Sequence, residues 1–330
     1  MNKKRFLWFL LAAAVFAATG ILGVRSALGA RERAASLSEQ AASSFAAMFS
    51  GETDYTLPSE PYVAKVSVDG TIAEGSSVPL SADGYSHEAT LDFVDRLIED
   101  ENNVGILLYI DSPGGTITAS DELYLKLLDY KATGRPIWCY CDTTACSGGY
   151  YVAAAADEIC ANRNCLCVNI GVYISVYNFS QLFEKYGVEQ LAFKSSENKG
   201  IGMTGIPWTD EQKEIYQSIV DQYYEQFLAV VAEGRGMTPE RVRELDDGRE
   251  MLAAQALKAG FIDSIGRYEE YEKKVLAAAG TELLYEPAAA MPSWMDMLQQ
   301  FTSSLPKSDA QSLLDFAEAN SGIVVMAYAG

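Results

Sequence analysis

Histidine is almost absent from this sequence: His87 is the single one among 330 residues. A serine hydroxyl is a weak nucleophile until a base removes its proton, and histidine is a frequent base in that role. His87 lies in the polar segment GYSHE at residues 84–88, and we interpret it as a surface loop residue rather than as a catalytic base. One histidine also argues against a zinc site built from histidine ligands.

Basic residues are scarce as well. The chain has 25 lysines and arginines against 45 aspartates and glutamates, which gives a net charge of −20. A face that binds nucleic acid needs clustered Lys and Arg, so we expect no nucleic acid partner and a solvated acidic surface. At 330 residues, 49% of them hydrophobic, the chain is long enough for one large domain with appendages.

An uncharged stretch of 19 residues lies at the N-terminus, where residues 6–24 follow the basic tripeptide KKR at residues 3–5. A helix of this length spans about 28 Å, close to the thickness of a bilayer core. A cleaved secretory peptide has a shorter apolar region. We therefore expect residues 1–24 to form a cytoplasmic n-region and a signal-anchor transmembrane helix, with the rest of the chain exported. Ala27 and Gly29 could still form a signal peptide cleavage site, so removal of the anchor stays open.

Six cysteines fall between residues 139 and 167. Two pairs have a single residue between their members, which is not the spacing of common zinc ligand pairs. We interpret all six as small buried core residues. A disulfide cannot be assigned from the sequence and stays open for an exported protein. The residues are Cys139, Cys141, Cys146, Cys160, Cys165 and Cys167.

Three segments follow the N-terminal span. Residues 25–60 are rich in Ala, Ser and Glu and carry no strand pattern, so they predict a stalk or linker. Residues 61–286 predict the folded domain, because apolar strand patterns alternate there with helix patterns. This alternation implies right-handed crossovers and a largely parallel sheet. Residues 287–330 predict a C-terminal tail.

We expect strands at residues 62–68, 104–110, 137–141, near 159, and at 190–193. We expect helices at residues 90–99, around 123–128, and at 150–156, 179–186, 209–233, 239–245 and 253–259. The helix at 209–233 carries a stripe of apolar residues about one turn apart, which suits either the core or a neighbouring chain, and we interpret it as core. The stripe consists of Ile215, Ile219, Tyr223 and Phe227.

Two glycine-rich turns carry the candidate chemistry. DSPGG at residues 111–115 follows one expected strand, and ACSGG at residues 145–149 lies between another strand and a helix. In this hypothesis Ser147 is a nucleophile at the head of a helix. The backbone N–H groups of Gly114 and Gly148 would then hold the oxyanion that develops on the substrate. Glycine permits the close backbone approach that this requires.

A lysine is the alternative to a histidine base. It must be neutral to act, so its pKa must fall from about 10.4 to near 7–8, which burial can cause. Lys194 and Lys199 lie in the segment FKSSENKG at residues 193–200, and composition does not choose between them. SENK at residues 196–199 also matches the S-x-x-K of β-lactamases, but the companion S-D-N and K-T-G elements of those enzymes are missing from the sequence.

These motifs, in this order, resemble the signal peptide peptidase A family of membrane-anchored serine–lysine proteases, within the Clp protease and crotonase superfamily. The resemblance runs from about residue 62 to 266. It rests on the two glycine-rich turns, on IGV at residues 170–172, on FKS with Lys199, and on the segments EGRG at 233–236 and DGR at 247–249.

The resemblance implies an α/β, Clp protease/crotonase-like fold with repeated β-β-α units. It implies Ser147 as the nucleophile, Lys199 as the general base, and Gly114 and Gly148 as oxyanion donors, with Lys194 a structural neighbour. It also implies hydrolysis of remnant signal peptides and other hydrophobic peptides, a homo-oligomer with dyads shared between protomers, and no metal or organic cofactor.

The chain departs from the family at residues 167–169, which are Cys-Val-Asn where the family usually has Thr-Gly-Ser. The serine normally there helps to orient the lysine, and the amide oxygen of Asn169 can accept the same hydrogen bond. Cys146 and Ser196 replace a usual alanine and glycine. A catalytically impaired relative that binds peptides or membranes as a scaffold is therefore an alternative. A crotonase-type acyl-CoA enzyme is a third, against which export argues.

The end of the tail, IVVMAYAG at residues 323–330, is apolar and contains small residues. It is similar to the peptides that such an enzyme would bind, so it could serve as a ligand of its own chain. A tail without a binding role is the alternative.

Overall fold

The structure, a computed structural model, describes residues 56–74, 84–287 and 323–326. The expected transmembrane span at residues 6–24 and most of the expected stalk lie outside these residues. Among the helices that the structure describes, none combines the length and the apolar character needed to cross a membrane.

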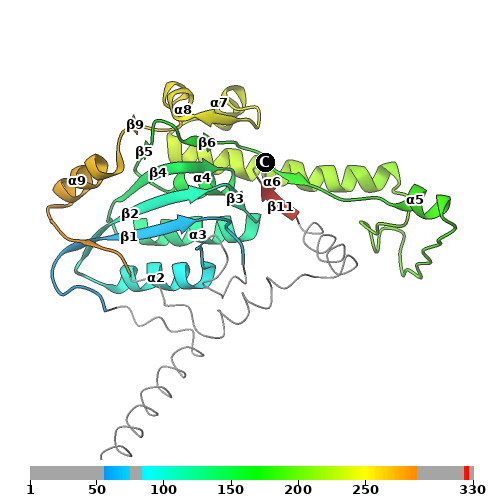
Figure 1. Ribbon diagram of the computed structural model, residues 1–330, viewed down its shortest axis with the longest axis horizontal. Helices are drawn as coiled ribbons and strands as arrows, with labels where there is room; N and C mark the ends of the chain where they lie inside the picture. The colour runs from blue at the N-terminus through cyan, green and yellow to red at the C-terminus, as the bar shows by residue number, and fades with distance from the viewer. Residues whose placement is uncertain (1–55, 75–83, 288–322, 327–330) are drawn as a thin grey trace, which may run out of the picture. The chain divides into compact units, whose positions relative to one another are not determined.

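Eight strands of the described chain form one mixed sheet (Figure 1). They are β1 (Tyr62–Asp69), β2 (Asn103–Ser112), β4 (Ile137–Cys146), β5 (Glu158–Ala161), β6 (Leu166–Val168), β8 (Glu250–Leu252), β9 (Ser264–Ile265) and β10 (Leu284–Tyr285). The order β10-β1-β2-β4-β5-β9 is parallel throughout. The far end of β4 pairs in parallel with β6, and β8 pairs with β6 antiparallel. The expectation of a largely parallel sheet is confirmed, and β8 makes the sheet mixed.

A second, three-stranded sheet joins distant parts of the chain in the order β3-β11-β7. Its strands are β3 (Gly114–Gly115), β7 (Tyr173–Ile174) and β11 (Ile323–Met326). β11 is antiparallel to both neighbours. Residues 323–326 of the tail therefore lie between the first glycine-rich turn and the segment that follows the second.

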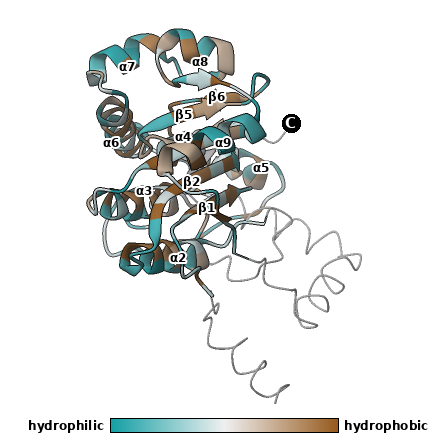
Figure 2. Cartoon of the chain, turned by 90° about the vertical axis from the view of Figure 1, so that its left-hand side faces the viewer, coloured by the Kyte–Doolittle hydropathy of each residue, from teal (hydrophilic) through white to brown (hydrophobic). Residues whose placement is uncertain are grey.

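Helices cover both faces of the large sheet. α2 (His87–Glu99), α3 (Ile117–Lys131) and α4 (Gly148–Ala153) pack on one face, and α9 (Tyr268–Ala279) packs on the other. Side chains alternate between the faces: Ala64 and Ile106 lie in the core under the first three helices, whereas Val63 and Leu107 lie under α9. α2 and α3 show brown and teal bands in the hydropathy view (Figure 2), the pattern of helices that bury one face.

The long helix α6 (Asp210–Arg235) begins and ends with clear sequence features. Thr209 accepts the N–H of Gln212 in a capping box, and Gly236 ends the helix in the left-handed conformation. The C-terminal half packs in the core, where Phe227 is buried, whereas Ile215, Ile219 and Tyr223 are only half-buried. Of the four residues of the stripe, only the last, Phe227, lies in the core. α7 (Pro239–Leu245) and α8 (Ala253–Ala259) follow, as expected.

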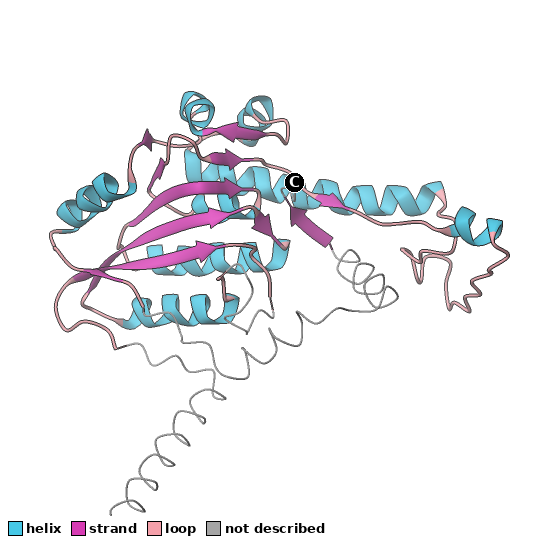
Figure 3. Cartoon of the chain, viewed as in Figure 1, coloured by secondary structure: helices cyan, strands magenta, loops and turns pink. Residues whose placement is uncertain are grey.

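The segment between α5 (Ser180–Lys185) and α6 corrects one prediction. Residues 190–193, expected as a strand, belong to the loop drawn in Figure 3. Leu191 is 70% exposed and Phe193 is 99% exposed. Their alternation resembles a strand, but within the described chain no strand pairs with this segment. The expected helix at residues 179–186 is α5.

The expectation for His87 is wrong. The residue is 3% exposed and begins α2 instead of lying in a surface loop. Its Nδ1 is 2.7 Å from the hydroxyl of Tyr85, and its Nε2 is 2.8 Å from Oε2 of Glu122 on α3. A histidine with both ring nitrogens engaged in this way ties α2 to α3.

The cysteines are buried and free, as expected for core residues. Cys139 and Cys141 lie on the same face of β4, with their sulfur atoms 3.8 Å apart. Burial raises the pKa of the Cys146 thiol next to the predicted nucleophile. A thiol in that environment stays neutral and unreactive.

Candidate active site

Ser147 lies where β4 ends and α4 begins. Its φ of 51° and ψ of −120° fall in a region that serine rarely adopts, and such conformations occur at functional sites. The backbone N–H donates to the carbonyl oxygen of Val168 at 2.8 Å. The Oγ atom is buried and has no hydrogen-bond partner among the described residues. The turn therefore presents a hydroxyl whose bonding capacity is unused.

The two glycine-rich turns meet at Ser147. A β-carbon at Gly114 would lie 2.8 Å from the backbone nitrogen of Gly148 and 2.9 Å from Cβ of Ser147. Gly114 also has a φ of +109°, which favours glycine. The structure thus brings the predicted nucleophile and both predicted oxyanion donors into contact.

The N–H of Gly114 already has a partner, because it donates to Oγ of Ser112 at 3.1 Å. A substrate oxyanion would have to replace that bond. A further backbone nitrogen, not predicted from the sequence, lies here: the nitrogen of Gly115 is 3.0 Å from the position of a β-carbon at Gly148. The second glycine of the DSPGG turn is the sequence feature that could have identified this nitrogen.

A small cavity of about 10 Å³ opens beside Gly148, between α3, α4 and α6. Ser120 of α3 lines it with a buried hydroxyl that has no partner among the described residues. The hydroxyl of Tyr151 donates to Asp121 at 2.6 Å and accepts from Gln226 at 2.9 Å. Burial, together with the bond to Asp121, raises the pKa of Tyr151, so this hydroxyl stays protonated. Sequence reasoning did not identify Ser120.

Asn169 follows Val168, and both residues have positive φ, 57° and 76°. The side-chain nitrogen of Asn169 donates to the carbonyl oxygen of Gly248 at 2.6 Å. This bond fixes the amide so that its oxygen remains available as an acceptor, the role predicted for orienting the lysine. Next to it, Oδ2 of Asp246 accepts the N–H of Ile170 at 3.0 Å, and burial raises the pKa of that carboxyl to about 6.

Lys199 does not meet Ser147 within one chain. It is exposed, and its neighbour Asn198 donates to Glu211 at the start of α6 at 3.3 Å. The cavity beside Gly148, by contrast, is lined by Tyr223 and Phe227 in the second half of α6. Those two parts of the helix are about 18 Å apart along its axis, at about 1.5 Å per residue. Figure 1 shows the loop before α6 at the end of the helix that is distant from α4.

Lys194, the other candidate, lies in the same exposed loop. Its Nζ donates to the carbonyl oxygen of Glu197 at 3.0 Å, so its ammonium group is bonded to its own loop. Neither lysine contacts the serine in a single chain.

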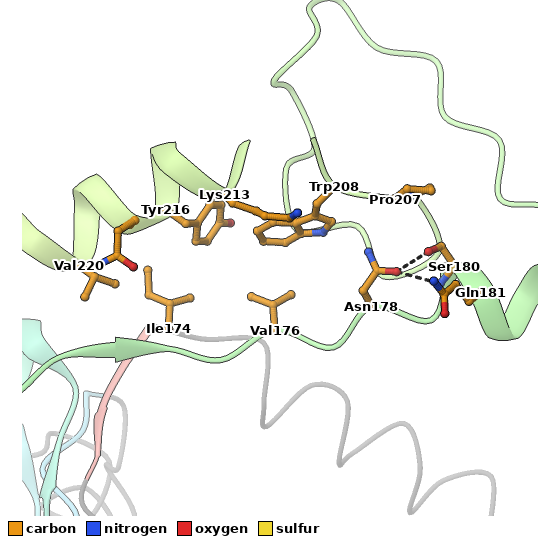
Figure 4. Close-up of a pocket in the computed structure, with 11 residues that line it drawn as sticks. Ile174, Val176, Asn178, Ser180, Gln181, Pro207, Trp208, Lys213, Tyr216 and Val220 are labelled. Carbon is orange, nitrogen blue, oxygen red and sulfur yellow. Dashed lines mark hydrogen bonds between the residues drawn. The ribbon is translucent and has the colours of Figure 1, made fainter. Parts of the chain in front are cut away.

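A larger cavity of about 580 Å³ lies beside this loop (Figure 4). Ile174 and Val176 face Tyr216 and Trp208 across it, and the indole Nε1 of Trp208 is buried without a partner among the described residues. The remaining lining residues are Asn178, Ser180, Gln181, Pro207, Lys213, Gln217 and Val220.

β11 runs past the site as an extended strand. Met326 is in register with Gly114 and Val325 with Gly115, while Ile323 is in register with Ile174. Residues 323–326 of the tail thus lie between β3 and β7. The rest of the tail lies outside the described residues.

Comparison with known proteins gives consistent matches. Residues 129–282 match the family described as Peptidase family S49. The chain is 35% identical over 240 residues to a "Putative signal peptide peptidase SppA" of Enterococcus faecium, covering 71% of this chain and 70% of that protein. It is 28% identical over 209 residues to "Serine protease SPPA, chloroplastic" of Arabidopsis thaliana, covering 62% of this chain and 30% of that one.

Among solved structures, the chain is similar to a mutant of ClpP1 from Listeria monocytogenes. The TM-score is 0.41 at 15% sequence identity, over 62% of this chain and 92% of that one.

Proposed function

Because the chain belongs to peptidase family S49, a family of serine proteases, we propose that it is a membrane-anchored endopeptidase that cleaves remnant signal peptides and other hydrophobic peptides. The observation that carries this proposal is the environment of the Ser147 hydroxyl. Its hydroxyl is buried and unpartnered among the described residues, on a strained turn between two glycine backbones.

The reaction follows from this geometry. Lys199, in its neutral form, takes the proton of Ser147 as Oγ attacks the peptide carbonyl carbon. The oxyanion is held by the N–H groups of Gly148 and Gly114. To do this, the N–H of Gly114 gives up its hydrogen bond to Oγ of Ser112. The lysine then gives its proton to the leaving amine, and an acyl-enzyme ester remains. Water, deprotonated by the same lysine, releases the acid and restores Ser147.

The base reaches Ser147 from another protomer in this proposal. Lys199 lies in an exposed loop remote from the serine of its own chain. The segment around it also exposes large apolar side chains, which indicates a surface that another protein covers. They are Tyr177, Phe179, Leu182, Tyr186, Val188, Leu191 and Phe193. A second copy that covers this surface would also remove water from the lysine, and burial is what lowers a lysine pKa.

The substrate binds as an extended strand between β3 and β7. β11 supports this mode, because its backbone pairs with both strands and Met326 is in register with Gly114. Main-chain pairing of this kind gives affinity without demanding a particular side chain at every position. Such recognition suits a protease for hydrophobic segments of varied sequence.

Residues 6–24 anchor the protein in the cell membrane by a single pass, with the catalytic domain on the extracytoplasmic side. An uncharged stretch of this length after three basic residues supports the anchor. Hydrophobic peptides left in a bilayer would then be at the same membrane as the enzyme.

The test is labelling with a fluorophosphonate that reacts with activated serines, performed on the full-length protein in detergent. Wild type should be labelled at Ser147, and Ser147→Ala should not. Cleavage of a hydrophobic peptide should be lost in the same variant. A wild-type protein that binds peptide but is neither labelled nor active would instead be the impaired scaffold.

A further inference from the structure

Asp246 lies just beyond α7 and takes no part in the proposed proton transfers. Its side chain is buried, with 2% of the residue exposed. The Oδ2 atom accepts two backbone N–H groups, from Ile170 at 3.0 Å and from Gly248 at 3.1 Å. The Oδ1 atom is also buried and has no partner among the described residues. A buried carboxylate with an unsatisfied oxygen is costly, so its presence calls for an explanation.

The backbone that Asp246 holds is strained. Val168 and Asn169 adopt positive φ in succession, 76° and 57°. For a β-branched residue such as valine this conformation is unusual and costs free energy. It persists when neighbouring bonds hold it. The bond from Ile170 to Asp246 holds the main chain on one side, and the bond from Asn169 to Gly248 holds the side chain.

This turn is connected directly to the nucleophile. The carbonyl oxygen of Val168 accepts the N–H of Ser147 at 2.8 Å, and Val168 is in register with Cys146 across the β4–β6 pair. A change in the path of residues 168–170 would therefore move the backbone of Ser147. It would also move the amide of Asn169.

We infer that Asp246 is a positioning residue for the hydrolysis. By holding residues 168–170, its carboxylate positions the carbonyl oxygen of Val168, which accepts the N–H of Ser147. It also positions the amide oxygen of Asn169, which would accept a hydrogen bond from the incoming lysine. This inference rests on the proposed role of Ser147. Asp246 touches neither the substrate nor the reacting atoms and acts through the turn.

Three variants test it, each measured for kcat and KM on a peptide, for the rate of fluorophosphonate labelling of Ser147, and for thermal unfolding. Asp246→Ala removes the acceptor and should lower kcat and the labelling rate roughly 100-fold, the loss that a displacement of about 1 Å can cause. KM should change little. Asp246→Asn keeps an oxygen in place and should restore most of both rates.

Asp247→Ala is the matched control. Asp247 is adjacent in sequence, but its side chain is 59% exposed and pairs with Arg249, so this variant should behave as wild type in kcat and labelling. If Asp246→Ala does not fold, Asp246→Ser replaces it, because the shorter side chain cannot reach both N–H groups.

A folded Asp246→Ala or Asp246→Ser protein with near wild-type kcat and labelling overturns the inference, even if its unfolding temperature falls. So does Asp246→Asn if it is as slow as the alanine variant. Failure of the wild type to be labelled at Ser147 is a different result, because it would contradict the proposed function before Asp246 is considered.

Discussion

Gly114 packs directly on Ser147, so that a β-carbon at Gly114 would come within 2.9 Å of Cβ of the serine. Alanine at this position would also have to adopt a φ of +109°. Gly114→Ala should therefore reduce kcat by roughly 100-fold or more, the effect of losing an oxyanion donor. Steady-state hydrolysis of a hydrophobic peptide measures this.

Gly134→Ala is the control for backbone strain. Gly134 has a φ of +83° but open space around its α-carbon. The free energy of unfolding of this variant should fall by about 1–2 kcal/mol, because alanine is strained in the left-handed conformation. Its kcat should not change. Equal kcat losses in the two variants would show that strain, and not the contact with Ser147, explains the effect.

Ser147→Ala and Lys199→Ala should be similarly inactive, each losing on the order of 10⁴- to 10⁶-fold in kcat. The two residues act as one catalytic unit, so removing either one should cost about as much as removing both. Lys194→Ala should keep most of the turnover, because its ammonium group donates to the carbonyl oxygen of Glu197 in its own loop. Single-turnover kinetics of the three variants provide the comparison. The reverse ranking of the two lysines would contradict the assignment of the base.

Mixing two inactive proteins should restore activity if the dyad is shared. In a closed ring assembled at random from equal amounts of Ser147→Ala and Lys199→Ala chains, about one interface in four joins an intact serine to an intact lysine. About a quarter of wild-type turnover should return after subunit exchange. The control mixes Ser147→Ala with the double variant and should stay inactive. Mixed oligomers that form but do not cleave would place the whole site in one chain.

Removal of the tail should expose the strand position beside β3. Truncation after Glu286 should lower KM for a peptide several-fold, because β11 pairs with Gly114 and Gly115 where substrate is proposed to bind. Val325→Pro tests the same point in a full-length chain, since proline removes the N–H of the residue in register with Gly115. Unchanged KM in both proteins would rule out competition by the tail.

Asp246 should make stability depend on pH. Its pKa is raised from 3.8 to about 6 in the folded protein, so folding favours the neutral acid. That contribution is fully present below pH 3.8 and is lost as the pH rises through about 6. Asp246→Asn cannot ionise and should gain stability relative to wild type between about pH 4.5 and about pH 7.5, by at most about 3 kcal/mol.

Denaturant unfolding of both proteins at the two pH values measures this difference. Asp247→Asn serves as the control, because the pKa of that exposed carboxyl is lowered by its bond to Arg249. A relative stability of Asp246→Asn that does not change with pH would contradict the prediction.

The parts of the fold that were predictable depend on local patterns. Continuous apolar runs identified β2 and β4, which are buried on both faces, and Thr209 and Gly236 marked the ends of α6. Both glycine-rich turns were identified from neighbouring residues. That they converge on Ser147 was a hypothesis from the two turns themselves, supported by the family resemblance.

The parts that were missed depend on contacts between distant residues. His87 is buried because Glu122, 35 positions away, approaches its ring. Residues 190–193 alternate as a strand would, but no described strand pairs with them. Asp246 is bonded to Ile170 across 76 positions, and nothing in the local sequence of an acidic chain distinguishes this aspartate from its neighbour Asp247.

The position of Lys199, remote from Ser147 of its own chain, bears on how such an enzyme could stay inactive before it is needed. If the dyad is shared as proposed, a newly made chain would be its own inactive precursor, because half of its catalytic pair would come from a second molecule. Activity would then rise more steeply than enzyme concentration, and dilution would switch it off without any covalent change.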